Sequence, residues 1–182
     1  MSTTQQTIRG SHDRPTGHPP APAGSATIMR DDKPITILLV DDDADCRLLI
    51  RDAIADCKVS NEILEADNGI EALKLLRRED GYRDAPRPGL IYMDIEMPGL
   101  DGIETLRCIK DDPNLRDIPV VMMTGVNDEE QMRRAAMLGA NSYTIKPASA
   151  EAFLRTVLAS TTYWLTIHQY PERHLPSPLC RR

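Results

Sequence analysis

The sequence of 182 residues lacks several features that mark common protein classes. Its longest unbroken apolar runs, Ile37–Val40 and Pro119–Met123, fall far short of the roughly 20 residues that a membrane-spanning helix needs. No apolar stretch follows the N-terminus as in a signal peptide, and the four cysteines show no paired spacing typical of zinc, haem or a disulfide framework. The 22 basic residues are outnumbered by 28 acidic ones, so no basic excess favours nucleic acid. We expect a cytoplasmic protein with reduced thiols and no direct nucleic-acid or membrane partner.

Composition divides the chain into three parts. Residues 1–34 are rich in proline, glycine, serine and threonine with few apolar residues, which predicts a disordered arm. Residues 35–168 carry regular apolar patterns and form a body large enough to bury about two-thirds of its unfolded surface. Residues 169–182 contain three prolines and are predicted to be an irregular tail.

Within residues 35–168, short apolar runs alternate with segments whose apolar residues recur every three or four positions. The runs predict strands at 35–40, 62–66, 90–93, 120–124 and 142–145. The other segments predict helices at 45–57, 70–78, 103–110 and 128–138, and a final helix that Ser149 caps. This alternation is typical of an α/β fold with a doubly wound, five-stranded parallel sheet and helices on both faces. Such sheets bind ligands beyond the carboxyl ends of their strands.

Polar side chains follow four of the predicted strands. They are Asp41 to Asp43, Asp94, Thr124 and Lys146. Carboxylates brought together repel unless a cation or a proton neutralises them, and oxygen ligands alone suit Mg²⁺. A lysine and a threonine opposite that cation suit a phosphoryl group, and one carboxylate could act as a nucleophile that forms an acyl phosphate. Taken singly, each is also an ordinary turn or cap residue; their joint placement at one sheet edge favours the functional interpretation.

Five motifs in order resemble the receiver domains of two-component response regulators. They span residues 40–43 (VDDD), 93–102 (MDIEMPGLDG), 120–125 (VVMMTG), 138–140 (LGA) and 143–147 (YTIKP). The resemblance covers residues 35–165 and implies a flavodoxin-like sheet of strand order 2-1-3-4-5.

The resemblance also implies a metal site and a phosphoacceptor. In a receiver domain of this kind, Asp94 would accept the phosphoryl group and Asp42 would bind Mg²⁺ directly. Asp41 acts as an acidic neighbour through water, and the backbone carbonyl of Glu96 completes the ligands from the protein. Val126, two residues after Thr124, cannot orient a hydrolytic water, so we expect slow self-dephosphorylation.

A second group implied by the resemblance handles the phosphoryl oxygens and the switch. Thr124 and the Gly125 amide would contact these oxygens, and Lys146 would pair with them. A cis bond between Lys146 and Pro147 is expected to aim the ammonium inward. After phosphorylation Thr124 would move and Tyr143 would turn inward, which changes the face formed by the fourth helix, fifth strand and fifth helix.

The final helix points to partners. Its apolar stripe continues into Tyr163-Trp164-Leu165, an ending that resembles single-domain regulators of bacterial phytochrome-type kinases, which dimerise through this helix. The alternative is that Trp164 packs on the protein's own body. We expect a single-domain regulator, not an enzyme, that receives phosphate from a histidine kinase or histidine phosphotransfer protein and can form a homodimer; its downstream partner is unknown.

Two other classes fit part of the pattern. A phosphatase of the haloacid-dehalogenase type also forms an aspartyl phosphate and needs an acid two residues later, where Glu96 stands. However, the sequence that follows, Met97-Pro98-Gly99, fits the receiver turn better. A receiver-like scaffold that does not switch is the other alternative, and the intact acidic and lysine positions argue against it.

Overall fold

The computed structural model describes residues 34–55 and 61–167, which all belong to one structural unit. Its strands are β1 (Thr36–Val40), β2 (Glu62–Ala66), β3 (Leu90–Asp94), β4 (Val120–Thr124) and β5 (Ser142–Ile145). Its helices are α1 (Ala44–Ala55), α2 (Gly69–Arg77), α3 (Gly102–Asp111), α4 (Glu129–Met137) and α5 (Ala150–Thr162), and α5 continues into the π-helical turn η1 (Tyr163–Ile167).

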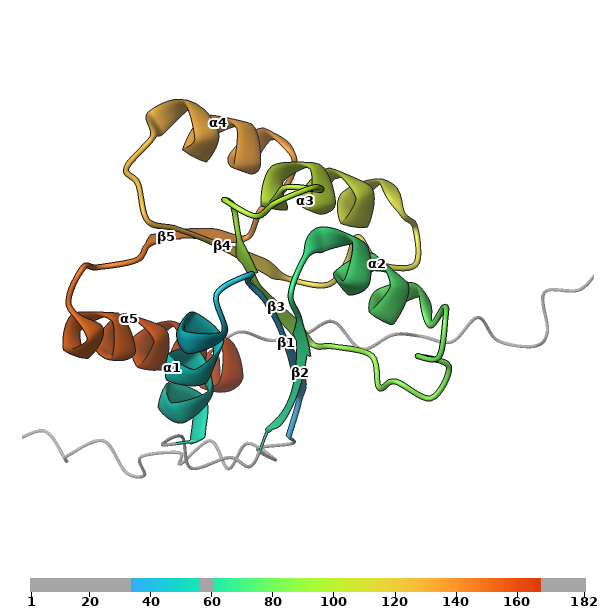
Figure 1. Ribbon diagram of the computed structural model, residues 1–182, viewed down its shortest axis with the longest axis horizontal. Helices are drawn as coiled ribbons and strands as arrows, with labels where there is room; N and C mark the ends of the chain where they lie inside the picture. The colour runs from blue at the N-terminus through green and yellow to red at the C-terminus, as the bar shows by residue number, and fades with distance from the viewer. Residues whose placement is uncertain (1–33, 56–60, 168–182) are drawn as a thin grey trace, which may run out of the picture. The chain divides into compact units, whose positions relative to one another are not determined.

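The five strands form one parallel sheet in the order β2-β1-β3-β4-β5 (Figure 1). The predicted fold class and strand order are therefore confirmed. All five residues of β3 and of β4 are buried, because helices cover both faces of the sheet at these strands. The predicted boundaries of β2, β4 and β5 agree with the structure, and β3 extends one residue further, to Asp94.

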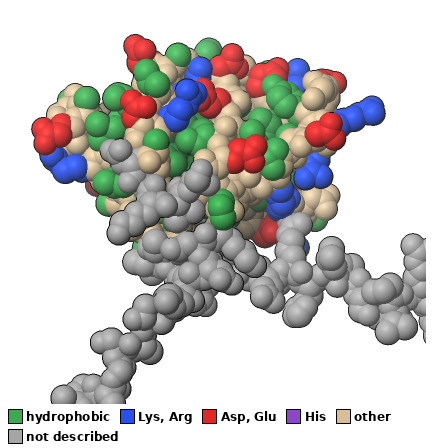
Figure 2. Space-filling view, turned by 90° about the horizontal axis from the view of Figure 1, so that it is seen from below, with side chains coloured by type: hydrophobic (Ala, Val, Ile, Leu, Met, Phe, Trp, Pro, Cys, Tyr) green, Lys and Arg blue, Asp and Glu red, His purple; other side chains and the backbone are tan. Residues whose placement is uncertain are grey.

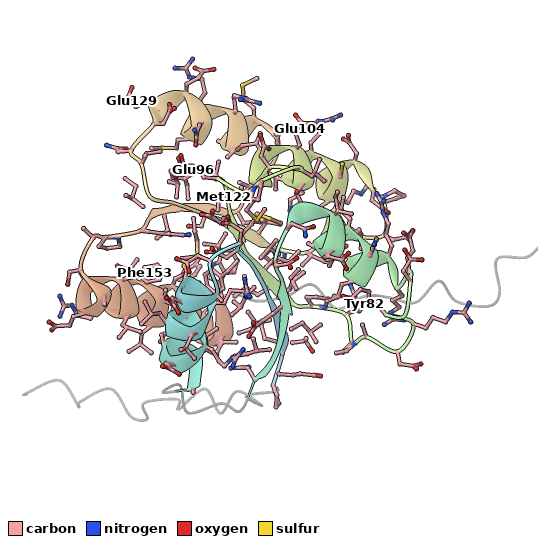
Figure 3. All side chains as sticks on the ribbon, in the orientation of Figure 1. Tyr82, Glu96, Glu104, Met122, Glu129 and Phe153 are labelled. Carbon is pink, nitrogen blue, oxygen red and sulfur yellow. The ribbon has the colours of Figure 1, made fainter. Side chains whose placement is uncertain are left out.

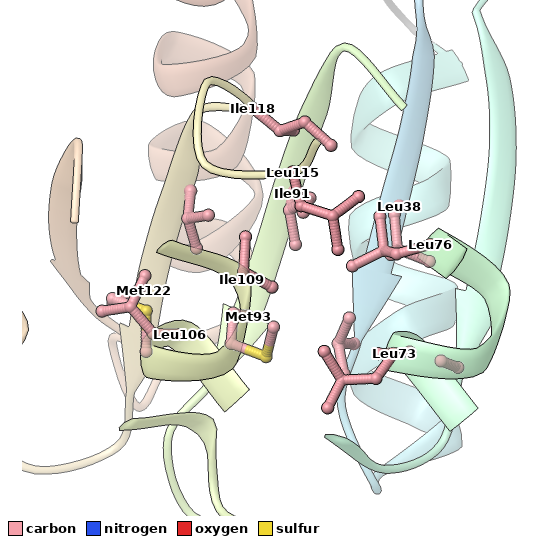
Figure 4. Packing of buried hydrophobic residues seen from close by; sticks show 14 of the residues in the cluster. Leu38, Leu73, Leu76, Ile91, Met93, Leu106, Ile109, Leu115, Ile118 and Met122 are labelled. Atoms are coloured by element: carbon pink, nitrogen blue, oxygen red, sulfur yellow. The ribbon is translucent and has the colours of Figure 1, made fainter. Parts of the chain in front are cut away.

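Alternate strand residues face two separate cores. Leu38, Ile91 and Met122 lie in the core under α2, α3 and α4 (Figure 4). Leu39 and Val121 lie in the other core, under α1 and α5. Burial of each aliphatic side chain stabilises the folded state by about 1.5–3 kcal/mol. The two cores therefore fix the position of the sheet edge that carries the polar residues.

Side-chain caps fix where the helices begin. Asn68, Asp101, Asp128 and Ser149 each accept a hydrogen bond from a backbone N–H in the first turn of α2, α3, α4 and α5. Ser149 is the predicted cap of the final helix, and Asp128 caps α4. Predicted α1 residues 56 and 57 lie outside the described residues, as do the predicted arm at 1–33 and tail at 169–182.

The end of α5 corrects one expectation. Trp164 is only 5 % exposed and packs into the core under α1 and α5, whereas its neighbour Tyr163 is 47 % exposed. The apolar stripe thus does not continue outward through Trp164, and packing on the protein's own body is the correct alternative. The buried Tyr92 hydroxyl also ties this region to β3 by hydrogen bonds to Ser160 and Thr161.

The surface carries mixed charge. On the part of the face visible in Figure 2, acidic and basic side chains are interspersed rather than gathered by sign. No helix in the described ranges has the length and apolar character that a bilayer crossing requires.

Candidate functional site

The carboxyl ends of β1 and β3 bring three carboxylates together. Asp41, Asp42 and Asp94 each place one oxygen so that all three oxygens lie within 4.8 Å of one another. Asp41 is 3 % exposed and Asp94 is 5 % exposed, while Asp42 faces solvent. Three negative charges this close are stable only when a cation or a proton compensates them.

Lys146, which follows β5, supplies one compensating charge. Its Nζ atom lies 2.7 Å from Asp41 Oδ2 and 2.7 Å from Asp94 Oδ1. Burial alone would lower the pKa of Lys146, but its hydrogen bonds to Asp41 and Asp94 outweigh burial and raise it. Burial raises the pKa of Asp94, and Lys146 opposes that rise. The expected cis Lys146–Pro147 bond is wrong: the bond is trans, and the backbone N–H of Lys146 donates to the Thr124 carbonyl at 2.6 Å.

Thr124 ends β4, and Tyr143 lies on the neighbouring β5, opposite Met122. The Thr124 side chain is fully buried, and its Oγ1 accepts a hydrogen bond from the Val126 N–H at 3.2 Å. The Tyr143 hydroxyl is buried and has no hydrogen-bond partner among the described residues. Burial raises the pKa of Tyr143. The Tyr143 side chain is half-buried and packs against the core under α2, α3 and α4.

Gly125 and Glu96 flank the entrance to the site. Both residues are exposed, Glu96 in the loop after β3 (Figure 3) and Gly125 directly after β4. A Cβ atom added at Gly125 would lie 3.9 Å from Glu96 Oε2, so the Glu96 side chain reaches across to this loop. The structure therefore brings seven of the eight expected site residues to the carboxyl edge of the sheet, and it places the eighth, Tyr143, further back in β5, opposite Met122.

Two residues on α1 belong to the site but were not expected there. Arg47 donates hydrogen bonds from Nη1 to the backbone carbonyl of Asp41 at 2.5 Å and from Nε to Glu65 at 3.1 Å. It therefore supports the backbone of the acidic turn after β1. Cys46 is buried beside Asp41; burial, and next its hydrogen bond to Asp41, raises its pKa to about 12. The only sequence signal for either residue is its place one helical turn after the acidic run.

Gly102 at the start of α3 permits the backbone geometry under Asp94. A Cβ atom there would lie 2.0 Å from the Asp94 carbonyl oxygen and 2.8 Å from the Ile95 Cα. These are backbone atoms that cannot move aside, so the close packing of α3 on the end of β3 requires glycine.

The donor set fits a hard divalent cation. Carboxylate oxygens alone form the cluster, and such ligands suit Mg²⁺ or Mn²⁺ better than softer metals. The single Lys146 ammonium leaves the cluster net negative, so a cation has a charge to neutralise there.

Similarity to known proteins shows the family to which this chain belongs. The family model described as "Response regulator receiver domain" matches residues 37–158. This chain belongs to the response regulator receiver family. The response regulator Rcp1 of Synechocystis sp. is 30 % identical over 132 residues, which cover 72 % of this chain and 90 % of that protein. A probable methanogenesis regulatory protein, FilR2 of Methanothrix harundinacea, is 36 % identical over 148 residues, or 81 % of this chain and 94 % of that protein.

Solved structures place this receiver near regulators that serve phytochromes. The phosphorylated cyanobacterial phytochrome response regulator RcpA is 34 % identical with a TM-score of 0.74, covering 76 % of this chain and 99 % of that one. The Mn²⁺-bound form of Rcp1 is 30 % identical with a TM-score of 0.73 over the same shares. The resemblance to receivers of the phytochrome-partner type is thereby confirmed. Response regulators are signalling proteins, so the haloacid-dehalogenase alternative is set aside.

Proposed function

We propose that this receiver accepts a phosphoryl group on Asp94 from the phosphohistidine of a histidine kinase or phosphotransfer protein. The observation that carries the proposal is the buried Asp94 carboxylate, which shares one lysine with Asp41 and lies within reach of Asp42. Neither neighbouring carboxylate is as well placed to act as the nucleophile, because Asp41 is engaged by backbone and Lys146 contacts and Asp42 faces solvent.

The protein's own groups then have distinct tasks. An Asp94 oxygen attacks phosphorus; the P–N bond of phosphohistidine breaks, and its electrons pass to the imidazole nitrogen, which takes up a proton from solvent. Lys146 neutralises negative charge on the phosphoryl oxygens, and the Gly125 amide donates to one of them. Because Thr124 Oγ1 accepts its bond from Val126, its hydroxyl proton stays available for a phosphoryl oxygen.

The acidic cluster would hold Mg²⁺ through Asp42, Asp94 and the Glu96 carbonyl, with Asp41 acting through water. When bound, Mg²⁺ would neutralise charge that develops on the phosphoryl group. The Mn²⁺-bound form of the related Rcp1 and the all-oxygen donor set support this assignment.

The test is phosphorylation of the full chain by acetyl phosphate with Mg²⁺, followed by intact mass. Wild type should gain one phosphoryl group and Asp94→Asn should gain none. Asp52→Asn, an exposed aspartate on α1, is the matched control and should be modified like wild type. Equal modification of Asp94→Asn would refute the proposal.

The output surface in this proposal is the face of α4, β5 and α5. It exposes four apolar side chains: Met132 and Met137 from α4, Ile145 from β5 and Leu158 from α5. Such a surface suits a second copy of the chain or another protein.

Light scattering after size-exclusion chromatography, with and without beryllofluoride and Mg²⁺, tests this face. We expect wild type to shift toward a dimer, Met137→Glu to stay monomeric, and Leu48→Glu, exposed on α1 instead, to behave like wild type. An oligomeric state indifferent to beryllofluoride would favour the non-switching scaffold.

The lifetime of the phosphorylated form depends on Val126. This side chain is 43 % exposed beside the site and has no group that can orient a water. We expect slow self-dephosphorylation, which Val126→Glu should accelerate. Loss of phosphate at the same rate in both proteins would contradict this role.

A further inference from the structure

A cavity of about 440 Å³ opens at the sheet edge opposite the acidic cluster, where α2 and α3 end. We call it the arginine pocket; its lining residues are Leu76, Arg77, Arg78, Arg87, Asp112, Asn114 and Leu115. Helices between parallel strands run antiparallel to them, so the C-terminal ends of α2 and α3 lie far from Asp94. The volume falls within the roughly 300–1,000 Å³ usual for small-molecule sites.

The lining carries three positive side chains and one negative one, in a chain of net charge −6. Arg77 Nε lies 3.7 Å from Asp112 Oδ2, which is too long for a hydrogen bond. Arg87 uses Nη2 on Asp117 at 2.8 Å, and Arg78 forms no ion pair with any described residue. Each guanidinium has five donors, so Arg77 and Arg78 keep donors in the fork geometry that matches phosphate.

The backbone at Arg78 forms the C-terminal cap of α2. Arg78 ends α2 in the left-handed conformation, with φ 59° and ψ 39°. This position is usually glycine, because a side chain strains it. The chain places a long cationic residue there instead, at the edge of the pocket.

The pocket also has an apolar wall. Leu76 and Leu115 both belong to the core under α2 and α3 (Figure 4). They also line the cavity. A site for a bare anion needs no such wall, whereas a phosphate ester has an organic part to place against it.

We propose that the arginine pocket binds a small organic phosphate. The guanidinium groups hold the phosphate, and the two leucines contact the organic part. This site is separate from the phosphoacceptor, and the segment between α2 and β3 contributes Arg78 and Arg87 to it.

The test is a titration of the full chain, without Mg²⁺, followed by backbone amide NMR shifts. The probes are inorganic phosphate, adenosine 5′-monophosphate and adenosine. We expect saturable shifts at residues 76–78 and 114–115 with both phosphates, tighter binding of the nucleotide, and none with adenosine. Shifts confined to Gly125 and Lys146 would assign phosphate binding to the acidic site and overturn the proposal, as would equal binding of adenosine.

Arg78→Gly separates binding from folding. Glycine relieves the strain at this helix end, so the variant should melt no lower than wild type yet bind phosphate about tenfold more weakly, as expected for loss of one charge-assisted contact. Arg83→Gly removes an arginine of the same segment that does not line the pocket, and it should bind like wild type. Unchanged affinity in Arg78→Gly, or equal losses in both variants, would refute the assignment.

Discussion

Replacing Lys146 by methionine should destabilise the protein more than the loss of any exposed lysine. Its Nζ atom lies 2.7 Å from two carboxylates whose side chains are only 4 % and 6 % exposed. At an effective dielectric constant of about 20, each pair attracts by about 6 kcal/mol, and desolvation of the lysine offsets much of the sum. Removing one partner of a buried ion pair costs about 3–5 kcal/mol, and we expect about 3 kcal/mol here.

Urea denaturation in EDTA measures this loss. With a slope near 2 kcal/mol per molar, the midpoint of Lys146→Met should fall by about 1.5 M. Lys74→Met is the matched control, because Lys74 also contacts two carboxylates, those of Glu71 and Asp80, but in exposed pairs that contribute little.

Two further measurements test whether the loss of stability is electrostatic. Mg²⁺ should stabilise Lys146→Met more than wild type, since the uncompensated carboxylates attract a cation more strongly. Adding Asp94→Asn to Lys146→Met should restore part of the lost stability, because one unpaired buried charge disappears. Equal losses in Lys146→Met and Lys74→Met, or no recovery in the double variant, would refute the electrostatic account.

Four other outcomes follow from the structure. Arg47→Met should weaken Mn²⁺ binding about tenfold or more, because it removes the donor that supports the Asp41 carbonyl. Gly102→Ala should cost about 1–3 kcal/mol and slow phosphorylation, because its Cβ would meet the Asp94 backbone. Trp164→Ala should cost about 3–5 kcal/mol in urea, as a buried core residue does. Burial lowers the pKa of Lys110, so wild type should gain stability relative to Lys110→Met as pH rises toward 10.5, because the folded state releases this proton first.

Each of these predictions has a control variant or a result that would contradict it. Arg51→Met also loses an ion pair with Glu65 but leaves Asp41 untouched, so it should bind Mn²⁺ like wild type. Normal phosphorylation of Gly102→Ala would show that α3 can shift away from Asp94. If Trp164→Ala were as stable as wild type, the residue would not be part of the core. A stability difference for Lys110→Met that does not vary with pH would leave its titration unconnected to folding.

Much of this fold was predictable because the central strands β1, β3 and β4 are covered on both faces. The sequence of a strand such as β4 is an unbroken apolar run. The first polar residue after the run, Thr124, marks the carboxyl end of the strand. The members of the site were predictable for the same reason, since parallel strands bring their ends to one edge.

The remaining features depend on contacts between distant residues. Nothing in the local sequence distinguishes Trp164, which packs inward, from Tyr163, which does not, because that choice depends on how α5 meets the sheet. The contact of Arg47 with the Asp41 carbonyl and the left-handed backbone of Arg78 are likewise tertiary features. The trans Lys146–Pro147 bond shows that Lys146 reaches the carboxylates without the isomer that was expected.

The buried Cys46 thiol can report the opening of α1 by its reactivity. A sulfhydryl that stays protonated and enclosed reacts with maleimide only when α1 lifts from the sheet, so the labelling rate measures how often that helix opens. In a chain whose other three cysteines are replaced by serine, a mass spectrometer could time this opening before and after phosphorylation, with no dye or tag added.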